Sequence, residues 1–100
     1  MSTTYGTVMI ARIAVPFDEV EASVRRWASE RRVPGFVHED VMLCDDGVTM
    51  VMSVFFADEA SYRALADDPA QAEWWATVVD PMLDGEVRWL DGHWRAAIDA

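Results

Sequence analysis

Two alternating apolar runs joined by a short acidic turn constrain the fold more than any other part of this sequence. The runs cover residues 36–44 and 48–57, and Asp45-Asp46-Gly47 joins them. An Asp-Gly pair between alternating hydrophobic residues is a strong signal for a β-hairpin with a type I′ turn, because both central residues of that turn need positive φ. We therefore expect a hairpin in which Asp46 and Gly47 are the two loop residues.

That turn fixes which side chains share a face of the hairpin. With Asp45 paired to Val48, one face is predicted to be almost wholly apolar, with Leu43, Val41 and Val37 opposite Met50, Met52 and Phe56. The other face has apolar ends and a polar centre, with Phe36, His38, Asp40, Met42 and Cys44 opposite Ala57, Phe55, Ser53, Val51 and Thr49. Both faces should be covered at least in part, and a chain this short has little material to cover two, which predicts a partner subunit.

Composition limits the classes of partner. The chain has 100 residues, of which 52% are hydrophobic, and this predicts a single domain over residues 1–100. Its net charge of −10 argues against nucleic acid and against an anionic membrane surface, since both require a basic patch. Cys44 is the single cysteine, which excludes an internal disulfide and a multi-cysteine zinc site. No apolar run approaches membrane-spanning length and no secretory leader is recognisable, so we expect a cytoplasmic protein.

The regions on either side of the hairpin contain a strand and a helix before it, and two helical segments and a strand after it. The β-branched run 5–15 predicts a strand with Met9 and Ala11 on one face, and Asp18 with Glu21 has the spacing of a capping box that opens a helix ending at Pro34-Gly35. Asp58 is predicted to cap a short helix, and Asp68-Pro69 to start a second one that Pro81 kinks or ends. Residues 86–95 are predicted to form a strand with a bulge or turn at Asp91-Gly92.

The predicted order is β-α-β-β-α-β, which is the ferredoxin-like arrangement of the α+β class. It places two helices, the second of them broken, on one face of a four-stranded antiparallel sheet. The other face carries several apolar positions, so a homodimer formed sheet to sheet is expected.

Five short stretches taken together resemble a known family. They are Gly6-Thr7-Val8, Val33-Pro34-Gly35-Phe36, the run from Phe56 to Tyr62, Asp67-Asp68-Pro69, and Trp89-Leu90-Asp91-Gly92. In this order and spacing, over nearly the whole chain, they resemble the antibiotic-biosynthesis-monooxygenase-like (ABM) branch of the dimeric α/β barrel superfamily. The resemblance implies a homodimer with a pocket between sheet and helices in each subunit.

Characterised members of the family include cofactor-independent oxygenases that convert aromatic polyketide phenols to quinones, haem-degrading enzymes, and isomerases or cyclases. The haem-degrading branch has an Asn before an Arg in its first strand, a Trp in helix two and a His ten residues later. Here those positions read Ala11, Leu65 and Trp75, and only Arg12 is retained. Haem degradation is therefore disfavoured, and no cofactor or metal is predicted.

The resemblance and the residue types together give a set of candidate site residues. His38, with Asp40 two residues on and Ser53 opposite, is the candidate base, and Arg12 or Arg88 would stabilise negative charge on an oxygen. Substrate-binding candidates are the ring-bearing side chains Trp74, Trp75, Tyr62 and His93. The simpler interpretation, which the residue patterns favour, is that Trp75 and the strand methionines belong to the core and that His38 belongs to a polar patch.

Three functions stay open at this point. The first is a cofactor-independent monooxygenase for a small aromatic or polyketide-like molecule, and the strand-one Asn that such oxygenases use is missing here. The second is a non-redox cyclase or isomerase of the same fold. The third is a non-catalytic protein that binds a small molecule or serves as an accessory.

Overall fold

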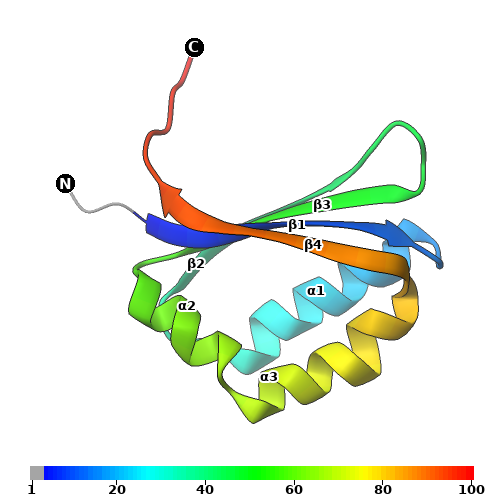
Figure 1. Ribbon diagram of the computed structural model, residues 1–100, viewed down its shortest axis with the longest axis horizontal. Helices are drawn as coiled ribbons and strands as arrows, with labels where there is room; N and C mark the ends of the chain where they lie inside the picture. Colours follow the sequence, from blue (N-terminus) through cyan, green and yellow to red (C-terminus); the bar gives the residue numbers. More distant parts are fainter. Residues whose placement is uncertain (1–3) are drawn as a thin grey trace.

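A four-stranded antiparallel sheet forms one layer of the protein, and the structure, a computed structural model, describes residues 4–100. The strands are β1 (Thr4–Ile13), β2 (Phe36–Leu43), β3 (Thr49–Phe56) and β4 (Leu83–Trp94). Their order across the sheet is β2-β3-β1-β4, so the first strand lies in the middle and the hairpin forms one side (Figure 1). The predicted hairpin and the ferredoxin-like strand arrangement are confirmed.

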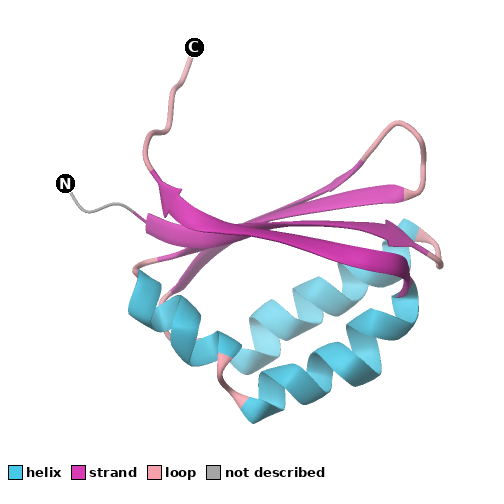
Figure 2. Ribbon diagram, in the orientation of Figure 1, coloured by secondary structure: helices cyan, strands magenta, loops and turns pink. Residues whose placement is uncertain are grey.

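The second layer consists of helices, all on the same face of the sheet (Figure 2). They are α1 (Phe17–Arg31), α2 (Glu59–Ala66) and α3 (Pro69–Trp74), followed by the π-helical turn η1 (Trp75–Val79) and the 3₁₀ turn η2 (Asp80–Met82). Among residues 4–100, no helix covers the opposite face of the sheet. Within residues 4–100, no helix is long and apolar enough to cross a membrane.

The core lies between the two layers. Its fully buried members come from the middle strands and α1: Met9, Ala11, Val20, Met50 and Met52. Met9 and Ala11 alternate with Val8 and Ile10 along β1, as the sequence predicted, because successive strand residues point to opposite faces.

Side-chain caps begin both later helices as predicted. The Asp58 carboxylate accepts a hydrogen bond of 2.8 Å from the Ser61 amide, and the Asp68 carboxylate accepts one of 2.9 Å from the Ala70 amide. Pro69 stands in the first turn of α3. Regular α-helix ends at Trp74, before Pro81, because the chain continues as a π turn and then a 3₁₀ turn.

The predicted start of α1 is wrong. The helix begins at Phe17 with Pro16 at the cap position, and no side chain caps it. Glu21 does not close a capping box with Asp18, since its carboxylate instead accepts a hydrogen bond of 2.9 Å from Arg25 on the exposed face. The helix ends at Arg31, and Arg32 reverses the chain in the left-handed region with φ of 47°.

The hairpin has the predicted register but a different turn. Gly47 has a φ of 76° whereas Asp46 does not have a positive φ, which excludes type I′. The loop spans residues 45–48, and the Cys44 amide donates to the Thr49 carbonyl at 2.8 Å. The predicted two-residue loop, 46–47, and the observed four-residue loop, 45–48, have the same centre. Leu43 therefore still pairs with Met50, and Val41 with Met52.

A bulge at the other end of the hairpin corrects the predicted pairing of Val37 with Phe56. Phe36 pairs with Phe56, and His38 with Phe55, so Val37 is the extra residue. The bulge turns Phe36 toward the helices, where its ring meets Trp27 at 5.2 Å between centroids. Val37 is left 56% exposed.

The predicted bulge at Asp91-Gly92 is also wrong. Pairing between β1 and β4 is continuous from Thr4 with Trp94 to Ile10 with Arg88, so this stretch is regular strand. The irregularity lies at the other end, between Ile10 and Arg12 opposite residues 84–88, where Gly85 adopts a φ of 85°. Gly85 supplies the left-handed conformation that a distorted strand accommodates.

Candidate functional site

An apolar cavity of about 600 Å³ lies between the sheet and the helices. This volume is typical of small-molecule sites, which bury most of a ligand among apolar and aromatic side chains. Every main element contributes to the lining. Its aromatic members are Trp27, Phe56, Tyr62, Trp74, Trp75 and Trp89, and its polar members are Thr7, Glu39, Arg63, Gln71 and Asp91.

Two pairs of tryptophans form aromatic walls of this cavity. Trp74 faces Trp27 of α1 with 5.9 Å between ring centroids, and the Trp27 indole donates a hydrogen bond of 2.9 Å to the Gln71 side chain. Trp75 faces Trp89 of β4 at 5.0 Å. Adjacent helix residues point about 100° apart, which is why Trp74 meets α1 while Trp75 meets the sheet. Flat apolar faces on two walls suit a flat aromatic ligand.

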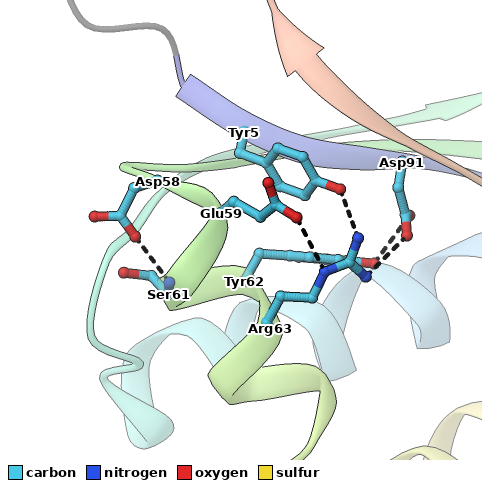
Figure 3. Close-up of polar contacts among 7 residues, drawn as sticks. All are labelled: Tyr5, Asp58, Glu59, Ser61, Tyr62, Arg63 and Asp91. Atoms are coloured by element: carbon cyan, nitrogen blue, oxygen red, sulfur yellow. Dashed lines mark hydrogen bonds and ion pairs between the residues drawn. The ribbon is translucent and has the colours of Figure 1, made fainter.

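A polar cluster that includes the lining residues Tyr62, Arg63 and Asp91 joins α2 to β1 and β4 (Figure 3). The Tyr62 hydroxyl donates to the Asp91 carboxylate at 3.0 Å, and Arg63 donates to the Tyr5 hydroxyl at 2.8 Å. Arg63 also lies 3.6 Å from the Asp91 carboxylate and 3.5 Å from that of Glu59. The single guanidinium is therefore shared between two carboxylates and a phenol.

Burial, followed by the hydrogen bond to Asp91, raises the pKa of Tyr62 above its ordinary value. Both causes disfavour the tyrosinate, since burial penalises charge and the neutral hydroxyl is the donor. Tyr62 thus stays a neutral hydrogen-bond donor across the physiological pH range. Asp91 is held in place by both Tyr62 and Arg63.

Glu39 is the other carboxylate that lines the cavity, and it lies on edge strand β2. Burial raises its pKa from the ordinary 4.5 to about 7, and the neighbouring His38 offsets part of that rise. A carboxyl group of this pKa exchanges its proton near neutral pH. Glu39 is therefore the lining residue best suited to accept or donate a proton.

Several solved structures share this architecture. The chain is similar to a monooxygenase from the gene ActVA-Orf6 of Streptomyces coelicolor, solved with the ligand nanaomycin D, with a TM-score of 0.77, 25% identity, and coverage of 99% of this chain and 94% of that chain. It is similar to a candidate antibiotic biosynthesis monooxygenase from Nitrosomonas europaea, with a TM-score of 0.70, 17% identity, and 93% and 91% coverage. It is also similar to SnoaB, a cofactor-independent oxygenase from Streptomyces nogalater, with a TM-score of 0.68, 19% identity, and 100% and 97% coverage.

The chain has the fold of the antibiotic biosynthesis monooxygenases. The two similarities below 25% identity support the fold alone. No family model matches the sequence, and no curated protein matches it.

Within this monooxygenase fold, three of the substrate-binding residues predicted from the sequence line the cavity. These are Tyr62, Trp74 and Trp75. His93 lies just beyond, two residues after Asp91 on β4, with its ring against the edge of Tyr5 at 4.8 Å. Their binding roles stay predictions.

The cavity lining includes neither His38 nor the two predicted arginines. His38 is exposed on the helix-free face of the sheet, where its Nε2 lies 2.7 Å from the Asp40 carboxylate. Arg12 and Arg88 share a second hollow of about 530 Å³, next to the irregular end of β4. The structure therefore does not bring the predicted base and the predicted arginines to the aromatic side chains.

Sequence reasoning missed the polar residues that line the cavity besides Tyr62: Thr7, Glu39, Arg63, Gln71 and Asp91. Glu39 carried a usable signal, because it is the single acidic residue on a hairpin face that is otherwise apolar. Arg63 and Asp91 lie 28 residues apart, and only the packing of α2 against β4 brings them together.

Proposed function

We propose that this protein is a cofactor-independent monooxygenase that oxidises a small aromatic, polyketide-like phenol in the cavity between sheet and helices. The observation that carries the proposal is the cavity itself. It combines aromatic walls with a few polar groups at defined positions. The similarity of this protein to a monooxygenase, over 99% of the chain, supports oxygenation as the reaction class.

The proposed reaction needs no external reductant. A phenol with a free ring C–H reacts with one O₂ to give a quinone and one water, so one oxygen atom enters the product and the other leaves as water. The protein would bind the phenol between the tryptophan walls, assist loss of the hydroxyl proton, and exclude bulk water. The resulting phenolate is electron-rich enough to react with O₂ directly, which is the chemistry that the family resemblance implies.

We also propose that the protein acts as a homodimer formed through the helix-free face of the sheet. That face bears apolar side chains from all four strands: Val8, Ile10, Met42, Val51, Phe55 and Leu90. Met42 is 54% and Leu90 52% exposed. Burying such a face in a second copy would remove it from water.

Oxygen uptake tests the proposed reaction. Purified protein is mixed with 1-naphthol or anthrone in metal-chelating buffer, and O₂ and quinone are measured together. We expect one O₂ consumed for each quinone formed. Leu65→Trp, which adds a ring to the cavity lining, should abolish uptake, whereas the exposed Ala60→Trp on the same helix should not. Turnover that continues unchanged without O₂ would contradict the oxygenase and favour an isomerase or cyclase.

A further inference from the structure

Glu39 is placed differently from the other ionisable groups of the cavity. It lies on the helix-facing side of β2, opposite Val54 of β3. Within residues 4–100, its carboxylate has no hydrogen bond and no ion pair, and its surroundings in the cavity are mostly apolar. An acceptor oxygen that is committed to no other group can accept a proton from a ligand.

One row of residues runs straight across the sheet from Glu39 to the polar cluster. Glu39 pairs with Val54, Val54 with Thr7, and Thr7 with Asp91. Neighbouring strands lie about 4.8 Å apart, so the two acidic residues at the ends of this row have α-carbons about 14 Å apart. The cavity lining thus has one carboxylate on each edge strand of the sheet, Glu39 on β2 and Asp91 on β4.

The two carboxylates differ in what they can do. The ionisable groups that line the cavity with Glu39 are Tyr62 and Arg63 from α2 and Asp91 from β4, while α1, α3, β1 and β3 contribute none. Asp91 already accepts a hydrogen bond from Tyr62 and faces Arg63, and Tyr62 stays neutral. His38 is next to Glu39 in sequence but points to the other face of the sheet.

We propose that the Glu39 carboxylate accepts the hydroxyl proton of a phenol bound in this cavity, an inference that rests on the proposed phenol-binding function. In this step the phenol O–H bond breaks, a new O–H bond forms on a Glu39 carboxylate oxygen, and the electron pair stays on the phenolate oxygen. The step consumes no oxidant. It assigns to Glu39 the task that the sequence pattern had given to His38.

The proton transfer can be measured without turnover. 4-Nitrophenol, whose phenolate is yellow, is bound anaerobically and titrated between about pH 5 and 9. In the native protein the phenol and Glu39 form a coupled pair, so the phenolate should appear over a broad range that begins at low pH. Glu39→Gln should give a single-proton curve. Glu30→Gln, an exposed carboxylate at the end of α1, should match the native protein.

Kinetics give the second measurement. Glu39→Gln should lower kcat about 100-fold with little change in KM, and should remove the ascending limb of the pH profile near neutral pH, whereas Glu39→Asp should restore part of the rate. A Glu39→Gln titration identical to that of the native protein, or no phenolate signal in either, would overturn the proposal. This result is distinct from failure of the proposed function, which is an absence of O₂ uptake in the native protein while the anaerobic titration still responds to Glu39.

Discussion

The Tyr62 hydroxyl lies 3.0 Å from the Asp91 carboxylate and thereby joins the middle of α2 to edge strand β4. The same tyrosine ring packs against Tyr5 and Phe56, with centroid distances of 5.4 and 5.5 Å. This contact ties the short helix α2 to the sheet at the cavity lining (Figure 3).

Removing that hydrogen bond should weaken the fold measurably. Tyr62→Phe keeps the ring and deletes the donor, so the free energy of unfolding in urea should fall by about 1 kcal/mol. Asp91→Asn and the double variant complete a double-mutant cycle, in which we expect a coupling energy of about 0.5–1.5 kcal/mol. Strictly additive effects would show that the two groups do not interact in solution.

Glu39 should make the stability of the protein depend on pH. Its pKa is about 7 in the folded protein and ordinarily 4.5. Above pH 4.5 the unfolded chain therefore loses this proton before the folded protein does. The free energy of unfolding of the native protein falls as the pH rises to about 7 and stays at the lower value above that pH. Partial exposure of Glu39 reduces the effect. The free energy of unfolding of Glu39→Gln, relative to that of the native protein, should therefore rise by roughly 2 kcal/mol between pH 4.5 and 8.

Chemical denaturation at several pH values measures this gain. Glu30→Gln serves as the control, since Glu30 is exposed and should show a constant difference from the native protein. A Glu39→Gln difference that also stays constant with pH would contradict a raised pKa.

The aromatic walls should strengthen the binding of ligands that carry aromatic rings. Trp75 faces Trp89 across 5.0 Å, and a ligand that stacks on Trp75 loses that contact if the ring is removed. We expect Trp75→Leu to weaken 1-naphthol binding about tenfold and Trp75→Phe to weaken it less, because an aromatic pair contributes about 0.5–1.5 kcal/mol. Isothermal titration calorimetry measures both. Equal losses in the two variants would argue against stacking on this wall.

The helix-free face of the sheet should control oligomeric state. Leu90 pairs with Val8 and is half exposed on that face. Leu90→Glu would place a charge in the proposed interface, so analytical ultracentrifugation should show the native chain as a dimer and this variant as a monomer. Ala22→Glu, on the exposed side of α1, should leave the dimer intact. A native protein that sediments as a monomer would refute the interface.

Local sequence determined the elements whose signals act within a few residues. Alternation along β1, the cap at Asp58 and the Asp68-Pro69 restart all appear as predicted. The hairpin register was also predictable despite the wrong turn type, because both loops have the same centre. Together with short connections, these elements leave few alternatives to the ferredoxin-like order.

Tertiary structure decided the site. The bulge at Val37 turns Phe36 toward the helices, and no local sequence pattern predicted that extra residue. Arg63 and Asp91 meet because α2 packs across β1, and the raised pKa of Glu39 depends on its burial in the folded chain. Proximity and burial of this kind depend on three-dimensional packing, whereas the residue type alone determines only what a side chain can do once it is placed.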